Sequence, residues 1–221
     1  MSSLAKRSWR RSESKFKTLS KQFSRSGILF VVSAPSGAGK TTLVEAVRKA
    51  SDLFYSVSCA TRAPRSGETD GEDYQFLSDA DFRAKVGAGD FLEHAQVHGD
   101  FYGTLREPVL TNVKNGVDVL IDIDTQGAAT IRNCADPVIR QALADVFIMP
   151  PDLDELRRRL RKRGTETEEQ IERRLETAVR EMELWRDYRY TIISGSVEED
   201  LEKFRCIMAA ESYLSRRLRP K

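Results

Sequence analysis

The sequence has few of the residues that cross-link small secreted domains or hold structural zinc. It contains three cysteines and two histidines in 221 residues. Cys59, Cys134 and Cys206 are too few and too scattered for a disulfide framework or a zinc site, so we expect packing residues in a reducing compartment. No apolar run approaches the roughly 20 residues that a membrane-spanning helix needs, and no secretory apolar segment is recognisable. The composition therefore favours a cytoplasmic protein without a membrane segment.

Acidic residues are nearly absent from the first 26 residues, which hold eight lysines and arginines and a single acid, Glu13. This segment has a net charge of +7, so the rest of the chain carries −5 within the overall +2. A serine-rich basic segment without an apolar stripe is typical of a solvated, disordered tail. Its composition is also typical of a mitochondrial presequence, and a weak contact with nucleic acid is a third interpretation. We expect a disordered tail over residues 1–26, no nucleic-acid partner, and a globular part that begins near Gly27.

Two glycines and a proline lie within five residues of one short stretch, SAPSGAGKTT at residues 33–42. It follows the apolar run ILFVV and precedes LVEAV, and its glycines and proline predict a turn from a strand into a helix. Backbone N–H groups at a helix N-terminus attract anions, while Lys40 adds a cation and Thr41 a hydroxyl that could ligate magnesium. The stretch fits the phosphate-loop consensus G-x-x-x-x-G-K-[ST], except that Ala34 replaces the first glycine. A glycine-rich turn without a ligand is the alternative, and the flanking strand and helix favour phosphate binding.

Further apolar runs recur at intervals that suit buried parallel strands, with helical patterns between most of them. These runs are YSVS at 55–58, VDVLIDI at 117–123, DVFIM at 145–149 and YTIIS at 190–194. Strands that alternate with helices predict an α/β fold with a parallel sheet covered on both faces. Such sheets bind ligands at the carboxyl ends of their strands. We therefore expect the phosphate loop, the pair Asp122 and Asp124, and Ser194 with Gly195 to lie in one cleft.

Two stretches depart from this alternation. Residues 59–104 are rich in glycine, aspartate, arginine and aromatics, which predicts an insertion of short strands and turns. Residues 151–184 contain capping-box patterns at Asp152 and at Thr167 and predict two amphipathic helices that meet at Gly164. Arginines are dense on this helix pair, and we expect most of them on a solvated face.

Five segments, in this order, together resemble guanylate kinases. They are SAPSGAGKT, SVSCATRAPRSGETDGEDY, FLEHAQVHGDFYGT, LIDIDTQGA and RKRGTETEEQIERRL, and the resemblance covers nearly all of the chain after Gly27. It implies a P-loop α/β core flanked by helices, with a small mixed-strand insertion that binds GMP and a helical lid. The expected boundaries are residues 27–57, 105–150 and 178–221 for the core, 58–104 for the GMP-binding insertion and 151–177 for the lid.

The resemblance implies a site for the acceptor GMP. A kinase that phosphorylates a nucleoside monophosphate needs cations for the acceptor phosphate, and arginine binds phosphate oxygens bidentately. The guanine edge with N1–H and the exocyclic amine presents donors and suits a carboxylate, a role that the family pattern assigns to Glu93. The GMP-binding residues implied are Ser58, Arg62, Arg65, Tyr74, Glu93, Tyr102, Thr104 and Asp124. Surface charge is the ordinary interpretation of two loop arginines, and here the resemblance and the two tyrosines favour phosphate binding.

The resemblance also implies an ATP site and a set of cations around the transferred phosphoryl group. The ATP-binding residues implied are Ala34, Pro35, Ser36, Gly37, Ala38, Gly39, Lys40, Thr41, Thr42 and Ser194. The implied catalytic residues are Lys40, Arg159, Arg163 and Arg174, and the implied contacts of Mg²⁺ or its water shell are Thr41 and Asp122. Helix capping is the alternative role for the aspartates after the strand. No general base is needed, because a phosphate monoester with a second pKa of about 6 is mostly deprotonated at neutral pH.

The sequence departs from the family pattern at two places. Asp100 and Phe101 replace an asparagine and a tyrosine, which adds a negative charge near the acceptor phosphate. Ser194 and Gly195 replace an asparagine and an aspartate near the adenine, so one hydroxyl stands where an amide would read the donor base. Both departures concern affinity and donor selectivity, and neither removes a catalytic group.

These patterns predict an ATP:GMP phosphotransferase of purine metabolism that uses Mg²⁺, accepts dGMP and acts as a monomer or homodimer. One alternative is a non-catalytic binding module, because guanylate-kinase-like domains of scaffold proteins hold partners with the same fold. The intact Gly37, Gly39, Lys40 and Thr41 argue against it. The other alternative is a related kinase with a different phosphorylated acceptor, and Glu93, Ser58 and the segment DGEDY argue against that.

Overall fold

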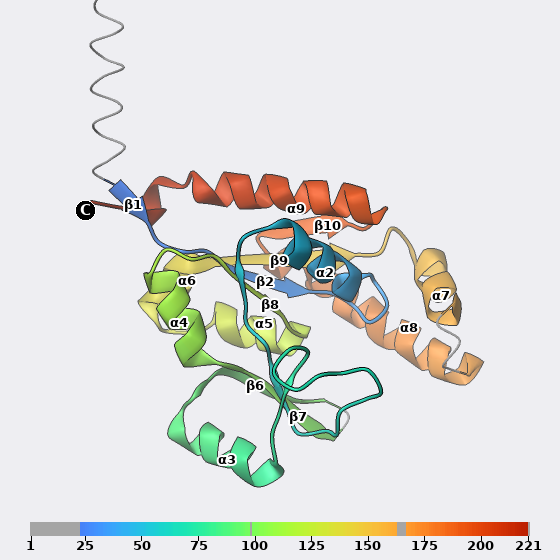
Figure 1. Cartoon of the computed structure of the whole chain (residues 1–221). Helices are drawn as coiled ribbons and strands as arrows, with labels where there is room; N and C mark the ends of the chain where they lie inside the picture. Colours follow the sequence, from blue (N-terminus) through green and yellow to red (C-terminus); the bar gives the residue numbers. More distant parts are fainter. Residues whose placement is uncertain (1–22, 98, 163–166, 221) are drawn as a thin grey trace, which may run out of the picture.

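The computed structural model describes residues 23–97, 99–162 and 167–220, which form a parallel sheet between helices, a second small sheet and a projecting helix pair (Figure 1). The central sheet has the strand order β10-β9-β2-β8-β3, and all of its neighbouring strands are parallel. Its strands are β2 (Leu29–Ser33), β3 (Phe54–Tyr55), β8 (Val119–Asp122), β9 (Leu143–Met149) and β10 (Tyr190–Ile193). Each apolar run that the sequence singles out overlaps one of these strands, so the predicted α/β fold with a parallel sheet is confirmed.

Helices cover both faces of this sheet, because successive strand residues point to opposite sides. Leu29 and Val31 of β2 belong to one buried apolar cluster, and Phe30 and Val32 belong to the other. The first cluster is covered by α4 (Arg106–Lys114), α5 (Thr125–Arg132) and α6 (Pro137–Ala142), and the second by α2 (Lys40–Ala50) and α9 (Val197–Ser212). Within the described ranges, none of the helices has the length and apolar character of a membrane span. The strand that precedes the phosphate loop is thus buried on both faces.

The insertion forms a four-stranded mixed sheet in the order β5-β4-β7-β6, as its short-strand pattern predicts. Its elements are β4 (Cys59–Ala60), β5 (Gln75–Phe76), α3 (Asp79–Ala88), β6 (Phe91–Val97) and β7 (Asp100–Leu105). The helix α3 was not predicted. It begins where the Ser78 side chain accepts the N–H of Asp81, and Phe82 is its one buried side chain. A helix with so little apolar surface lacks the periodic signal by which sequence analysis finds helices.

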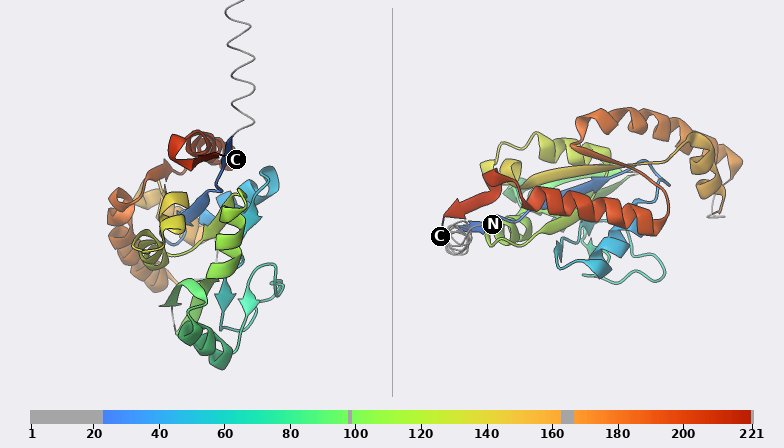
Figure 2. Two further views of the ribbon diagram at one scale, coloured as in Figure 1. Left: turned by 90° about the vertical axis from the view of Figure 1, so that its left-hand side faces the viewer. Right: turned by 90° about the horizontal axis from the view of Figure 1, so that it is seen from above.

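The helix pair consists of α7 (Leu153–Lys162) and α8 (Glu168–Met182), followed by the 3-10 helix η1 (Glu183–Asp187). Both predicted caps are present, because Asp152 accepts the N–H of Glu155 at 2.7 Å and Thr167 forms a complete capping box. A separate apolar cluster joins the two helices, and Figure 2 shows them projecting from the core at the end opposite the chain termini. The expected lid boundary at residue 177 falls inside α8, and the predicted junction at Gly164 lies outside the described residues.

A short antiparallel ribbon joins the two ends of the described chain. The strand β1 (Phe23–Arg25) pairs with β11 (Leu218–Pro220), and Arg25 forms an ion pair with Asp118 at 2.6 Å. Residues 23–25 of the segment assigned to the basic tail therefore form a strand, and residues 1–22 lie outside the described residues. The strand β1 has three residues and no alternation of buried and exposed positions, so the sequence pattern does not predict it.

A buried ion pair fixes the C-terminal segment to the core. Arg217, in the 3-10 helix η2 (Ser215–Arg217), is fully buried and pairs with the fully buried Glu211 of α9. Its guanidinium also donates to the backbone oxygens of Gln141 at 2.8 Å and Ala142 at 3.0 Å. The same glutamate accepts the hydroxyl of Tyr190 at 2.8 Å. Helices α9 and α6 and strand β10 are thereby linked through one carboxylate and one guanidinium.

We expect Arg217→Ala to lower the free energy of unfolding by about 3 kcal/mol, because the substitution leaves Glu211 buried without its main partner. The matched control is Arg216→Ala at the exposed neighbouring residue, which should change the stability by less than about 0.5 kcal/mol. Urea unfolding of the three proteins measures both values. Equal stability of the two variants would show that the ion pair makes no net contribution to the free energy of unfolding.

Candidate active site

The phosphate loop connects β2 to α2 and contains two glycines in the left-handed region, Gly37 at φ 90° and Gly39 at φ 106°. Residues with a Cβ rarely adopt these angles, so the turn requires glycine at both positions. Helix α2 begins at Lys40 without a side-chain cap, which leaves its first N–H groups for an anion. Ala34 packs against the apolar cluster beneath α2. Of the other predicted ATP contacts in the loop, Pro35 and Ala38 are buried, and Ser36, Thr41 and Thr42 are exposed.

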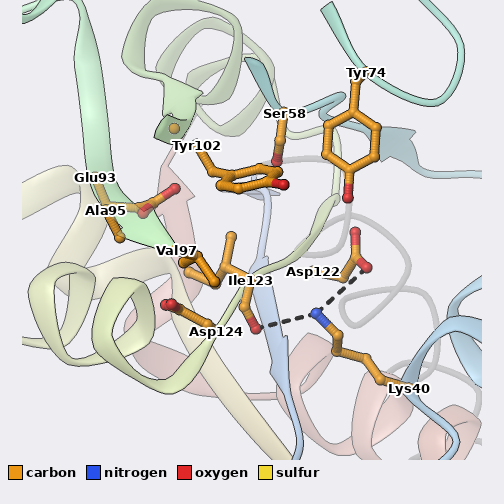
Figure 3. Close-up of a pocket in the computed structure, with 11 residues that line it drawn as sticks. Lys40, Ser58, Tyr74, Glu93, Ala95, Val97, Tyr102, Asp122, Ile123 and Asp124 are labelled. Atoms are coloured by element: carbon orange, nitrogen blue, oxygen red, sulfur yellow. Dashed lines mark hydrogen bonds and ion pairs between the residues drawn. The ribbon is translucent and has the colours of Figure 1, made fainter. Parts of the chain in front are cut away.

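Lys40 joins the phosphate loop to the end of β8 (Figure 3). Its Nζ donates to the backbone oxygen of Ile123 at 3.2 Å and lies 3.6 Å from Asp122 Oδ2. Asp124 accepts the N–H of Gly127 at 2.7 Å and caps α5, so it has the helix-capping role that was the alternative for these aspartates. Both aspartates line the cavity that opens beside Lys40. The predicted meeting of the loop with the end of β8 is therefore present.

Tyr55 is a residue that the sequence analysis missed. Its hydroxyl donates to Asp122 Oδ1 at 2.5 Å, and the guanidinium of Arg48 lies 3.9 Å from the centre of its ring. Burial, followed by the charge of Asp122, raises the pKa of Tyr55, so the hydroxyl remains a donor. The two oxygens of Asp122 therefore have different partners, Tyr55 on one side and Lys40 on the other. A tyrosine that ends a two-residue strand has no motif that would reveal this contact.

Glu93 lies on β6 with 5% of its surface exposed and accepts a hydrogen bond from Thr104 Oγ1 at 2.7 Å. Burial raises the pKa of Glu93 to about 7; the charge of Asp124 adds to this rise, and the hydrogen bonds from Thr104 oppose it. Helix α5 approaches this carboxylate closely at Gly127, where a Cβ would lie 2.6 Å from Glu93 Oε2. A buried carboxylate in a narrow polar space suits a ligand with adjacent N–H donors.

Five of the eight predicted acceptor residues line one cavity between the insertion and the end of β8 (Figure 3). Its lining includes Ser58, Tyr74, Glu93, Tyr102 and Asp124. These side chains come from the insertion and from the loop after β8, which are far apart in sequence. The opposite side of the cavity reaches Lys40 of the phosphate loop, so an acceptor in the cavity would lie next to a donor on the loop.

The two arginines of TRAPR differ in their surroundings. The guanidinium of Arg62 lies 4.8 Å from the centre of the Tyr74 ring and binds both oxygens of Glu68, at 2.6 and 2.8 Å. Glu68 also accepts the backbone N–H of Arg65 at 2.8 Å, so its carboxylate links both arginines of this loop. The side chain of Arg65 is exposed and does not line the cavity. Glu68 was not singled out, because an acid in a polar loop is usually solvated.

A second cleft lies between the phosphate loop, α7 and the end of β10. Its lining includes Gly37, Gly39, Thr42, Arg159, Ser194 and Gly195. Arg159 Nη1 donates to Ala38 O at 2.8 Å and to Ser194 Oγ at 3.0 Å. Arg174 Nη1 donates to Ser36 Oγ at 3.2 Å. Two of the predicted lid arginines therefore reach the loop, and Arg163 lies outside the described residues.

Four other arginines of the helix pair form ion pairs on its surface. The pairs are Arg157 with Glu172, Arg158 with Glu155, Arg161 with Glu168, and Arg173 with Glu169. The arginine side chains of these pairs are 40% exposed or more, and such pairs contribute little to stability because water screens them. As expected, most of the arginine charge on these helices lies on a solvated face.

Glu181 of α8 is a further carboxylate near the loop that the sequence analysis did not single out. Its Oε2 is buried and has no hydrogen-bond partner in the part of the chain that the structure describes. Burial raises the pKa of Glu181; the N–H of Ser36 and the charge of Lys40 lower it, and the charge of Asp124 adds to the rise. A glutamate among the many charged residues of α8 gives no sign that it faces the phosphate loop.

A buried strand, a turn with two left-handed glycines and a helix that begins at a lysine define a P-loop protein. The cavity beside Lys40 lies next to this loop, as the acceptor pocket of a P-loop kinase would. The sequence model described as guanylate kinase matches residues 26–211, and the chain belongs to the guanylate kinase family.

Curated relatives and a solved structure agree with this assignment. The chain is 43% identical over 187 residues to a guanylate kinase of Ruegeria sp. (strain TM1040), which is 84% of this chain and 85% of that protein. It is 45% identical over 197 residues to that of Syntrophotalea carbinolica, which is 88% of this chain and 91% of that protein. The crystal structure of guanylate kinase from Anaplasma phagocytophilum matches with a TM-score of 0.72 at 33% identity, over 89% of this chain and 92% of that one. The resemblance drawn from five segments is confirmed.

The pKa of Glu93 generates a prediction for the ligand-free protein. Its carboxyl has a pKa of about 7 in the folded chain against an ordinary value of 4.5, so the folded state binds more protons between these two values. The stabilising effect is present below about pH 4.5 and is lost as the pH rises through about 7. We expect the stability of Glu93→Gln relative to the wild type to rise by about 3 kcal/mol across this window.

Urea unfolding of the wild type and Glu93→Gln at several pH values measures this difference. Glu72→Gln, at an exposed position of the same insertion, is the control and should follow the wild type at every pH. If the wild type and Glu93→Gln had parallel pH profiles, the carboxyl would have an ordinary pKa.

Proposed function

We propose that this protein transfers the γ-phosphoryl group of ATP to GMP, giving ADP and GDP, and that dGMP is also an acceptor. Membership of the guanylate kinase family supports the reaction. The observation that carries the proposal is the buried Glu93 in a cavity that opens on Lys40 of the phosphate loop. Such a cavity suits a ligand with N–H donors at one end and a phosphate at the other, and GMP has this composition.

The proposed recognition of guanine depends on the ionised form of Glu93. Guanine offers N1–H and an exocyclic amine to the two carboxylate oxygens, whereas adenine would place a lone pair against them. Sites built on buried polar pairing can reject a mismatched analogue by about 10⁴–10⁵-fold. We place the acceptor phosphate near Tyr74 and Tyr102, with Arg62 beside them, because these side chains supply the hydroxyls and the cation that a phosphate requires.

The residues present also fit Mg²⁺, which we propose accompanies ATP. The hydroxyl of Thr41 is exposed on the first turn of α2, and the carboxylate of Asp122 lies next to the side chain of Lys40. Oxygen ligands of this kind are those that Mg²⁺ prefers, usually through one or two protein side chains with waters and substrate phosphates. When bound, the ion would neutralise charge on the transferred phosphoryl group.

Catalysis in this proposal consists of positioning and charge neutralisation. Lys40 holds the phosphates at the loop, and Arg159, Arg163 and Arg174 bring cations to the transferred group. The contacts of Arg159 and Arg174 with loop residues support their part in this, because both guanidinium groups already lie at the phosphate loop. The acceptor phosphate needs no general base, since it is mostly deprotonated at neutral pH.

We propose residues 58–104 as the GMP-binding insertion and the helix pair, expected over residues 151–177, as a lid on the donor side. We further infer a cytoplasmic enzyme that acts as a monomer or homodimer. A non-catalytic binding module of the same fold is the rival hypothesis. The two left-handed glycines and the Lys40 contacts favour the enzyme, because they maintain a complete phosphate loop.

Coupled measurement of ADP release with GMP, dGMP, AMP, CMP, UMP or no acceptor tests the proposal. We expect turnover with GMP and dGMP and little with the others. Glu93→Gln should lose most GMP turnover and most selectivity over AMP, because the amide presents N–H groups to donors of the base. Glu72→Gln is the matched control and should keep both. Unchanged selectivity in Glu93→Gln would show that Glu93 does not recognise guanine. ADP release at the same rate with and without an acceptor would contradict the proposed reaction.

Tyr55 generates a second prediction for catalysis. Tyr55→Phe removes the hydroxyl that donates to Asp122 and frees this carboxylate to turn away from Lys40. We expect kcat to fall by about tenfold, since a hydrogen bond to a charged group contributes about 1.5 kcal/mol or more. The control is Tyr190→Phe, which removes a hydroxyl that donates to Glu211 away from the site. Equal kcat values for the two variants would show that Tyr55 does not orient Asp122.

A further inference from the structure

The guanidinium of Arg159 is held at the mouth of the phosphate loop by three groups from three different elements. Its Nε donates to Glu155 Oε1 at 2.7 Å, within α7. Its Nη1 donates to the backbone oxygen of Ala38 at 2.8 Å and to Ser194 Oγ at 3.0 Å. Among the described residues, Nη2 has no hydrogen-bond partner. The arginine therefore contacts the protein through one side of its planar group and keeps further N–H donors for a ligand.

Ser194 is fixed in the orientation that makes this contact. It directly follows β10, its backbone N–H donates to Met149 O at 2.8 Å, and 5% of its surface is exposed. A Cβ on Gly39 would lie 3.5 Å from Ser194 Oγ and 3.3 Å from Arg159 Nη1. The serine hydroxyl and the guanidinium thus both lie directly against the glycine that precedes α2.

The neighbouring Gly195 has a structural role of its own. Its N–H donates to Asp200 Oδ1 at 2.9 Å, and a Cβ there would lie 2.3 Å from Glu199 Oε2. Glu199 completes the capping box that begins α9 at Ser196. The glycine therefore makes room for the helix cap, and the pair Ser194 and Gly195 is accounted for by contacts with Arg159 and α9.

We propose that Ser194 is a positioning residue for Arg159 and acts on the phosphates of the donor without reading its base. This inference rests on the proposed function for the identity of the donor, ATP. It differs from the expectation, drawn from the family pattern, that Ser194 lies near the adenine and that its single hydroxyl makes the donor selectivity less strict. A serine has one short hydroxyl, and here its oxygen accepts from the guanidinium. Without it, one Nη1 hydrogen loses its partner, and the backbone oxygen of Ala38 is the remaining contact of the guanidinium with the loop.

Titration calorimetry without GMP tests the inference on the wild type, Ser194→Ala, Arg159→Lys and the double variant. The ligands are ATP, ITP and inorganic tripolyphosphate, which has no base at all. We expect Ser194→Ala to weaken the binding of all three ligands by a similar factor of about tenfold, leaving the ATP to ITP ratio unchanged. In the Arg159→Lys background the same substitution should have less than about a twofold effect, because the planar guanidinium that it positions is gone.

Three results would overturn the inference. A changed ATP to ITP ratio with unaltered tripolyphosphate binding would show that Ser194 reads the base. Full additivity of the two substitutions would show that Ser194 acts independently of Arg159, and unaltered binding of all three ligands to Ser194→Ala would show that it does not act on the donor. Thermal unfolding of Ser194→Ala checks that the fold is kept, and Ser194→Thr, which retains a hydroxyl, should restore binding. These titrations contain no acceptor, so they measure donor binding whether or not the protein phosphorylates GMP. A protein that binds the donor but does not phosphorylate GMP would contradict the proposed reaction and not this inference.

Discussion

The parallel register of β2 and β8 is the constraint on which the candidate site depends. Val32 pairs with Asp122 in this register, so the phosphate loop leaves β2 beside the carboxylate that ends β8. Lys40 can then reach Ile123 O and Asp122 from the first residue of α2. A slip of one residue would turn Asp122 to the opposite face of the sheet. Because both strands are buried on both faces, the packing of the core fixes this register and thereby the position of the lysine.

The cavity beside Lys40 is lined by different groups near Glu93 and near Tyr74. Glu93 and Asp124 lie at the end of the cavity beneath α5, and burial keeps the pKa of Glu93 near 7. Tyr74 also lines the cavity, and the guanidinium of Arg62, which is paired with Glu68, lies 4.8 Å from the centre of its ring. In the proposed function, the base lies at the first of these places and the acceptor phosphate near the second. Near neutral pH a part of Glu93 is protonated, because its pKa is raised to about 7. A ligand that donates hydrogen bonds to Glu93 binds its ionised form, so ligand binding is coupled to the release of a proton.

The sequence allowed prediction of the features that depend on local patterns. Buried apolar runs predict the five strands, glycine and lysine spacing predicts the phosphate loop, and capping residues such as Thr167 predict the ends of the helix pair. The missed features depend on contacts between segments that are distant in the chain. Tyr55 meets Asp122 across 67 positions, and Arg159 meets Ser194 across 35, so no local pattern contains either pair. The helix α3 was missed for a different reason, since it buries a single side chain.

The seating of α7 on the phosphate loop explains which of its arginines reaches the site. A Cβ on Gly37 would lie 2.9 Å from a methyl of Leu160 and 3.1 Å from one of Leu156, so the apolar stripe of α7 packs directly on the loop backbone. Residues three and four apart share one face of a helix, and Arg159 follows Leu156 by three positions and adjoins Leu160. Its side chain is thereby directed at the loop, whereas Arg158 and Arg161 extend into solvent. Gly37 is needed both for its left-handed angle and for this close approach, so the same glycine shapes the phosphate loop and admits the helix that carries Arg159.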